Sequence, residues 1–266
     1  MTRLPTVFIP HGGGPCFYME WTRGPADTWQ RMADWLSGLA ASLDVRPRAL
    51  LVISGHWEEP GFAATGSGHP SLIYDYYGFP EHTYRLRWDA PGAPALAAEV
   101  VGRLGAAGLP ARVDPARGLD HGVFVPLKLV YPAADVPTVQ LSLDRRLDPA
   151  YHLAAGHALA GLRDEGVLII GSGMSYHNMR GYGDPASTPI ADRFDAWLTE
   201  SVEAEPAIRE ARLADWSQAP NARDAHPREE HLLPLMVAAG AGSGDPGRRI
   251  FSDRVMDTRV SAYRFG

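Results

Sequence analysis

Three short stretches of the chain share one design, an apolar run that leads through small residues to a histidine. They end at His11, His56 and His177, after the runs 6–10, 49–53 and 167–170. Continuous apolar runs of this length are typical of strands that are buried on both faces of a sheet. Open α/β sheets bind ligands beyond the carboxyl ends of such strands. We therefore expect these imidazoles to meet at one edge of a sheet, and a metal site is the simplest reason to collect them.

The residue types available restrict what the metal ligands can be. Neutral imidazole suits zinc, iron, copper and nickel. Cys16 is the only cysteine, so an intramolecular disulfide and a thiolate zinc cluster are both excluded. Histidine and carboxylate therefore remain as the ligands, which favours a site built mainly from histidines.

The roles of two further histidines, His121 and His231, cannot be decided from their spacing in the sequence alone. His121 is either an active-site residue or a loop histidine paired with its neighbour Asp120. His231 follows Glu230, and Pro234 indicates that a helix begins or is kinked there. Because helical neighbours point about 100° apart, one ion would rarely bind both residues of that pair. The remaining histidines are interpreted as surface or packed side chains: His69, His82, His152, His157 and His226.

Composition predicts the fold class and excludes some partners. A chain of 266 residues, 45% apolar and 21% charged, can bury the core of one large domain, residues 1–266. We expect an α/β fold with a mixed or mostly parallel central sheet, flanked by helices, and with the metal site at the strand carboxyl ends. The net charge of -6 gives no support to binding of nucleic acid or an anionic membrane. A small-molecule partner and a cytoplasmic location are expected, since no signal peptide or membrane-spanning run is evident.

The expected elements alternate in the manner of α/β folds. Helices are expected at about 27–43, 91–104, 126–131, 149–163 and 190–202, and strands at 136–143 and 260–263. Residues 206–224 are charged and poorly periodic. The aromatic segment 72–80 is long for a connection, which is typical of binding walls and lids. Its Tyr74, Tyr76 and Tyr77 are candidates to bind a flat substrate.

Eight sequence blocks together resemble a known family. The order of the blocks, from residue 11 to 235, is similar to that of the class III extradiol ring-cleavage dioxygenases, in the DOPA 4,5-dioxygenase-like branch. The blocks are His11-Gly-Gly-Gly-Pro, Ser54-Gly-His-Trp, Tyr74-Asp-Tyr-Tyr-Gly-Phe-Pro, Ala90-Pro-Gly-Ala-Pro, Leu119-Asp-His-Gly, Pro137-Thr-Val-Gln-Leu-Ser, Gly171-Ser-Gly with His177-Asn178, and Glu230-His-Leu-Leu-Pro-Leu.

The resemblance implies a non-haem metal enzyme that opens a catechol-type, DOPA-like ring with O2. It implies that His11, His56 and His231 bind the metal, and that His177 acts as acid/base and can serve as a fourth ligand. It also implies that His121 contacts substrate or dioxygen. One Fe(II) per subunit is expected for activity, and Zn(II) is a possible bound metal.

The chain departs from many relatives at two points. Family members that cleave protocatechuate have a glutamate as third ligand, whereas His231 takes that position here, beside Glu230. The His11-Gly-Gly-Gly loop replaces a Gly-Ser-Pro form. Two other classes of function stay open at this point: a zinc-dependent hydrolase, and a noncatalytic Memo-like binding protein on the same scaffold. Homo-oligomerisation is also possible.

Overall fold

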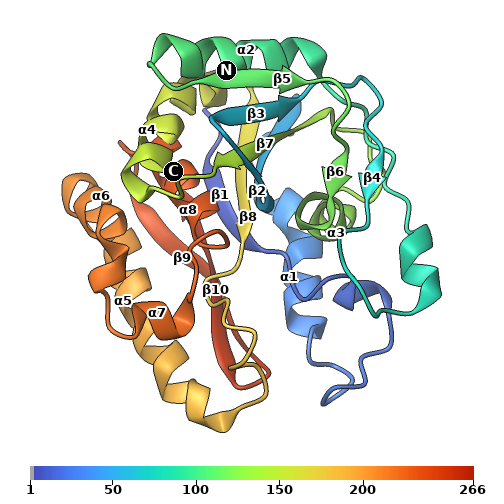
Figure 1. Cartoon of the computed structure of the whole chain (residues 1–266), viewed down its shortest axis with the longest axis vertical. Coiled ribbons are helices and arrows are strands. Elements are labelled where there is room, and N and C mark those ends of the chain that lie inside the picture. Colours follow the sequence, from blue (N-terminus) through green and yellow to red (C-terminus); the bar gives the residue numbers. More distant parts are fainter. Residues whose placement is uncertain (1–2) are drawn as a thin grey trace.

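A computed structural model describes residues 3–266 and contains an eight-stranded mixed sheet with helices on both faces (Figure 1). The strands follow one another across the sheet in the order β5 (Ala111–Asp114), β3 (Phe62–Thr65), β7 (Thr138–Asp144), β2 (Ala49–Glu59), β8 (Val167–Gly173), β1 (Thr6–Pro10), β10 (Thr258–Phe265) and β9 (Gly247–Val255). A small parallel pair, β4 (Leu72–Ile73) and β6 (Leu119–Asp120), lies apart from it. The predicted α/β class is confirmed.

The four central strands run parallel and end at one edge. Strand β2 pairs in parallel with β7 and β8, and β8 pairs in parallel with β1. All residues of β1 and β8 are buried, as their continuous apolar runs predicted, and all residues of β7 are buried as well. Antiparallel pairs β1–β10 and β3–β7 flank this centre and make the sheet mixed.

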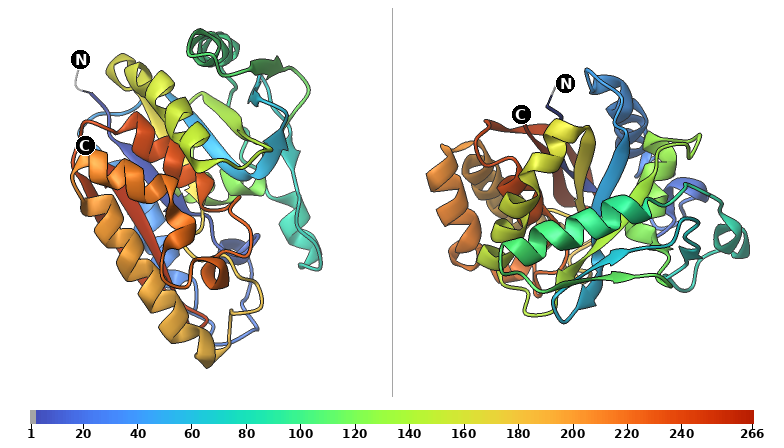
Figure 2. Two further views of the ribbon diagram at one scale, coloured as in Figure 1. Left: turned by 60° about the vertical axis from the view of Figure 1, so that its left-hand side comes forward. Right: turned by 90° about the horizontal axis from the view of Figure 1, so that it is seen from above.

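Helices cover both faces of the sheet, as the two views of Figure 2 show. One face carries α1 and α3, and the opposite face carries α8, α4 and α5. Successive residues of β8 face opposite sides of the sheet. The Ser172 hydroxyl donates to the carbonyl oxygen of Gly122 in α3, whereas Gly171 lies against Pro234 of α8. The helices are α1 (Gln30–Leu39), α2 (Pro94–Ala106), α3 (His121–Val130), α4 (Pro149–Leu159), α5 (Thr188–Glu203), α6 (Pro206–Ala214), α7 (Ala222–Ala225) and α8 (Leu233–Ala241). Among residues 3–266, every helix falls short of the length and hydrophobicity that a bilayer span requires.

The structure contains helices and a strand that the sequence patterns did not indicate. Residues 206–225 contain α6 and α7. Their periodicity was unclear because the inner side of α6 buries Arg209 together with Leu213. The backbone carbonyls of Val202 and Asp245 accept hydrogen bonds from the Arg209 guanidinium, so a polar residue stands where a pattern search expects an apolar one. The polar stretch after His56 also contains β3, which was missed.

Strand β2 is longer than its apolar run. The small residues Ser54-Gly55 after the apolar run indicate a turn before His56, but β2 continues to Glu59. Its pairing with β8 stops at Ser54, and its pairing with β7 is irregular between Ile53 and Glu58. This irregularity lies where His56 leaves the regular ladder, and irregular pairing of this kind is common beside functional sites.

Glycine at position 173 allows the C-terminal part of the chain to approach β8. A Cβ atom at Gly173 would lie 2.1 Å from the backbone oxygen of His231. That oxygen accepts a hydrogen bond of 3.0 Å from the backbone N–H of Met174. The close approach therefore fixes His231 against the end of β8.

Gly173→Ala is expected to destabilise the protein by about 1–3 kcal/mol, since the added methyl group must displace the backbone at His231. Thermal unfolding measures the change. The control Gly102→Ala adds a methyl group in open space on α2 and is expected to raise stability by roughly 0.4–1 kcal/mol. Equal stability of the two variants would show that residue 173 tolerates a side chain.

Candidate metal centre

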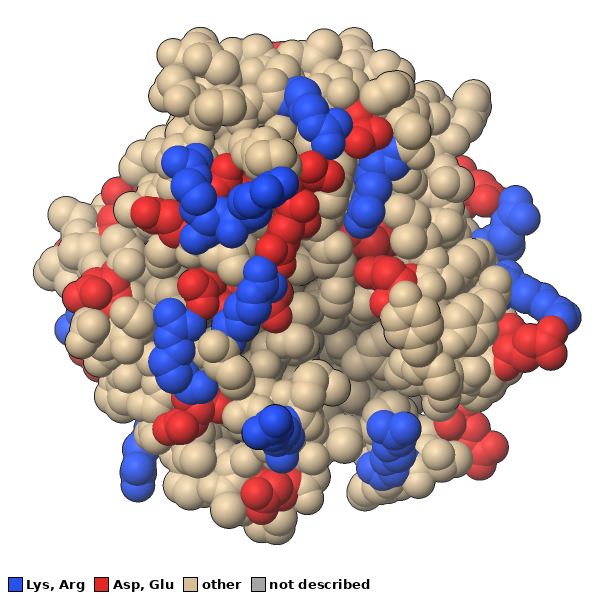
Figure 3. Space-filling model, viewed as in Figure 1, with Lys and Arg blue, Asp and Glu red and all other residues tan. Residues whose placement is uncertain are grey.

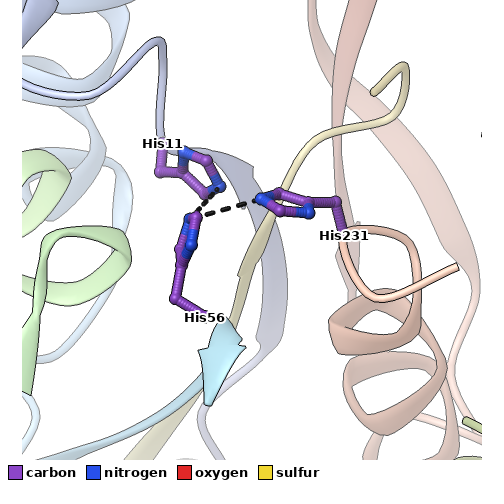
Figure 4. A group of neighbouring side chains, drawn as sticks. All are labelled: His11, His56 and His231. Atoms are coloured by element: carbon purple, nitrogen blue, oxygen red, sulfur yellow. Dashed lines mark hydrogen bonds between the residues drawn. The ribbon is translucent and has the colours of Figure 1, made fainter. Parts of the chain in front are cut away.

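Three histidines from distant parts of the chain converge at the carboxyl edge of the central strands (Figure 4). His11 follows β1, His56 lies on β2, and His231 lies two residues before α8. The Nε2 atom of His56 is 3.3 Å from Nε2 of His11 and 3.2 Å from Nε2 of His231. The imidazoles point toward one another, so the same atom of each ring faces one small volume.

Hydrogen bonds behind the rings set which nitrogen faces the centre. The Nδ1 atom of His11 lies 2.9 Å from the carbonyl oxygen of Gly12, to which it donates. The Nδ1 atom of His231 lies 3.0 Å from a carboxylate oxygen of Glu230. These partners place the proton on Nδ1 and leave the Nε2 lone pairs directed inward.

Burial keeps these imidazoles neutral. Desolvation, followed by repulsion from the neighbouring histidines, lowers the pKa of His11 and His231 well below the usual range. Desolvation likewise lowers the pKa of His56, although the charge of Asp75 opposes this. Neutral imidazole is the form that binds a metal.

The spacing of the nitrogens fits one transition-metal ion. Two nitrogens bound at about 2.0–2.1 Å to one tetrahedral ion lie roughly 3.3–3.4 Å apart. The observed separations of 3.2 and 3.3 Å agree with this value. The donor set suits Fe(II) or Zn(II), both of which accept imidazole nitrogen.

Glu230 is shared between two histidines on one side of the centre. Its Oε1 atom, which accepts from His231, also lies 3.5 Å from Nδ1 of His177. The His177 ring stacks on the His231 ring with centroids 3.4 Å apart. Burial pushes the pKa of Glu230 upward, but the hydrogen bond and charge of His177 outweigh it, so the pKa falls below its usual value. Glu230 therefore stays ionised behind both rings.

Asp75 holds His121 on the other side of the centre. One carboxylate oxygen of Asp75 lies 2.8 Å from Nδ1 of His121 and accepts the backbone N–H of His121 at 3.0 Å. The other oxygen is 3.8 Å from Nδ1 of His56. Burial raises the pKa of Asp75, but the hydrogen bond and charge of His121 prevail and bring it to about 2.

His121 is thus not paired with the carboxylate of its neighbour Asp120, which was one of the two interpretations that its sequence left open. Asp120 is fully buried and accepts a hydrogen bond of 2.8 Å from the Ser54 hydroxyl, and it is also bonded by Gln140. These contacts anchor the start of α3 to strands β2 and β7. They fix the backbone from which His121 projects.

A cavity of about 480 Å³ opens onto the centre. His11, His56, His121 and His177 contribute to its wall, whereas His231 lies beneath the ring of His177. Most of the other lining residues are aromatic or apolar: Trp21, Trp29, Tyr76, Tyr77, Phe79, Met174, Met179, Tyr182 and Met256. Figure 3 shows that one face of the molecule is hollowed, with mostly uncharged walls.

Of the three tyrosines predicted to bind substrate, two line this cavity. Tyr76 is buried and donates its hydroxyl to the carbonyl oxygen of Thr83, so it offers its ring. Tyr77 is 87% exposed at the mouth of the cavity. Tyr74 is not among the lining residues, since its hydroxyl donates to Leu86 and its ring packs on Phe124. The substrate contacts of all three stay a prediction.

A family model with the description "Catalytic LigB subunit of aromatic ring-opening dioxygenase" matches residues 5–263. The chain belongs to the LigB dioxygenase family. Enzymes of this family are metal-dependent, and the His11, His56 and His231 cluster is a site that could hold the ion.

Relatives place this LigB enzyme among the extradiol ring-cleaving dioxygenases. It is 44% identical to a 4,5-DOPA dioxygenase extradiol of Beta vulgaris over 82% of this chain and 81% of that protein. It is 35% identical to a protein of the same name from Escherichia coli K12, over 91% and 87% of the two chains. A crystal structure of an uncharacterized Escherichia coli K12 protein superimposes with a TM-score of 0.75 at 29% identity, covering 99% of this chain and 100% of that one.

The sequence did not reveal the roles of two carboxylates at this site, Asp75 and Glu230. Asp75 lies within the aromatic segment that we singled out, yet its bond to His121 joins residues 46 positions apart. Glu230 was considered only as a ligand in place of His231. The histidines interpreted as packed or surface side chains, such as the buried His152 and His226, all lie outside the cavity wall.

Substitutions separate the role of Glu230 from that of His231. We expect His231→Ala to abolish stoichiometric metal binding, because it removes a ligand. Glu230→Gln is expected to weaken metal affinity by about 10–100-fold, since it removes only the partner that orients the ligand. Metal content after equilibrium dialysis against Zn(II) or Fe(II) measures both.

Glu229→Gln is the matched control, because Glu229 pairs with Arg223 instead of a histidine. It is expected to leave metal affinity unchanged. If His231→Ala keeps its full metal content and Glu230→Gln loses its metal, Glu230 and not His231 is the ligand.

Proposed function

We propose that this enzyme opens the ring of a catechol-type, DOPA-like substrate with O2, using one Fe(II) per subunit. The observation that carries the proposal is the convergence of three neutral imidazoles on one small volume at the wall of an aromatic cavity. The residues that would hold the ion are His11, His56 and His231, with His177 as a possible fourth ligand. The whole chain, residues 1–266, is proposed to act as one catalytic domain.

The size of the cavity suits one aromatic ring with a substituent. Its volume of about 480 Å³ lies within the range of small-molecule sites. When bound, iron would supply positive charge that favours the ionised diol and a redox couple for its reaction with O2, whereas zinc has no redox couple for this. Tyr76 and Phe79 supply flat apolar surface against which the substrate ring packs.

His177 is proposed as the base that takes a diol proton. It lines the cavity, and the ionised Glu230 behind its Nδ1 stabilises the imidazolium that forms. The backbone N–H of His177 donates to the carbonyl oxygen of Ala225 at 3.0 Å, which fixes the loop after β8. Proton transfer therefore occurs on a positioned side chain.

His121 is proposed as the second proton-transfer group. Asp75 binds its Nδ1, so Nε2 is the nitrogen that remains for exchange with substrate or dioxygen. Its ring centroid lies 3.9 Å from that of His56. The two His–carboxylate pairs thus flank the proposed ion on either side.

The family match favours the dioxygenase over the two other classes that the sequence left open. A zinc hydrolase would turn over an ester or amide without consuming O2. A Memo-like binding protein would hold a ligand without turnover. A homo-oligomeric state stays a prediction.

The central test is anaerobic reconstitution with Fe(II), followed by addition of O2 and a panel of catechols. We expect one molecule of O2 to be consumed for each molecule of diol, and the yellow ring-opened semialdehyde to form. The Zn(II)-loaded protein is the control and is expected to be inactive. An iron-loaded protein that consumes no O2 with any diol would contradict the proposal.

His177→Ala is expected to retain iron and to lower kcat by about 100-fold or more, since it removes a general base but no required ligand. His56→Ala is expected to lose iron. Metal analysis and O2 uptake on the same preparations distinguish the two effects. An empty site in His177→Ala would make this residue chiefly a ligand.

A further inference from the structure

The cavity contains one permanently charged side chain that the site described so far does not use. Arg23 lines the cavity together with the histidines, and none of the lining residues is an aspartate or glutamate. Apart from the histidines and this guanidinium, the wall is made of glycine, aromatic residues and methionine. The exposed guanidinium of Arg23 can attract an anionic group of a ligand that lies in the cavity.

Arg23 has no acidic partner within residues 3–266. The exposed Arg228 pairs with Glu58 and Arg254 pairs with Asp192, whereas Arg23 and the exposed Arg180 have no such pair in the described part of the chain. No carboxylate is recorded within salt-bridge distance of Arg23 in this part of the chain. Its guanidinium is therefore available to a ligand.

The loop that carries Arg23 is anchored to the cavity wall. The indole N–H of Trp21 donates to the carbonyl oxygen of Arg23 at 3.1 Å. The Trp21 ring packs edge-on against Trp29, with centroids 5.4 Å apart, and both rings line the cavity. These contacts hold the backbone at residue 23 beside the aromatic wall.

We propose that Arg23 is a specificity-determining residue that binds a carboxylate on the substituent of the substrate, away from the diol. The planar guanidinium matches a carboxylate in a bidentate arrangement. A ring with its diol toward the histidines then carries its substituent toward the mouth of the cavity. The substrate class is an aromatic diol with an anionic side chain, and this rests on the proposed ring-opening function.

Two probes of similar shape and different charge test the proposal: 3-(3,4-dihydroxyphenyl)propionate and 4-ethylcatechol. Binding is measured by calorimetry on the Zn(II)-loaded protein, and KM and kcat on the Fe(II)-loaded protein. We expect Arg23→Gln to weaken binding of the propionate, and to raise its KM, by about tenfold. The affinity for 4-ethylcatechol and the kcat for either probe are expected to stay unchanged.

Arg180→Gln is the matched control. Arg180 is exposed and follows the lining residue Met179, but it does not line the cavity itself. It is expected to leave both affinities unchanged. An equal loss in Arg180→Gln would assign the effect to general electrostatic attraction and overturn the proposed contact.

Equal affinity of the wild-type protein for both probes would also overturn the role of Arg23, as would its failure to bind either probe. These outcomes differ from a failure of the proposed function. If the iron-loaded protein binds the propionate through Arg23 yet consumes no O2, the specificity role stands and the ring-opening reaction does not.

Discussion

The site depends on the repulsion between the Nε2 lone pairs of three neutral imidazoles, His11, His56 and His231, that point into the same small space. Their Nε2 lone pairs face one another at 3.2 and 3.3 Å, and burial with mutual repulsion disfavours their protonation. A metal cation offers all of the lone pairs an acceptor at once. The parallel centre of the sheet makes this arrangement possible, because β1, β2 and β8 bring their carboxyl ends to one edge.

The negative charges near the proposed metal site belong to carboxylates that bind the histidine rings and not to groups that would bind the ion. Three histidine ligands, as proposed, would leave the charge of a divalent ion uncompensated by the groups that bind it directly. Asp75 and Glu230 are held ionised beside His121, His177 and His231. Glu230 orients the ring of His231 and would compensate charge through that one intervening imidazole, a common arrangement around metal-binding histidines, while Asp75 orients His121.

Features that depend on a short stretch of sequence, such as the buried central strands, could be predicted from the sequence. The buried strands β1, β2 and β8 were evident from their unbroken apolar runs, which are typical of strands covered on both faces. The resemblance to a family then selected His231, which its own surroundings did not distinguish from Glu230. Contacts across the chain were not predictable: the bond from Asp75 to His121 and the buried Arg209 of α6 depend on tertiary neighbours. Strand β3 escaped notice because its four residues, Phe62–Thr65, are too few to show a period.

The positions of His11, His56 and His231 along the chain have a thermodynamic consequence. The proposed ligands are separated by 45 and 175 residues along the chain, so a bound ion would close loops that span most of the polypeptide. An ion that binds only the native arrangement adds free energy to folding, about 2.7 kcal/mol at a concentration of 100 Kd. If the proposed ion binds, its occupancy and the resistance of the fold to denaturation would be linked, and a chelator would lower the stability of the protein.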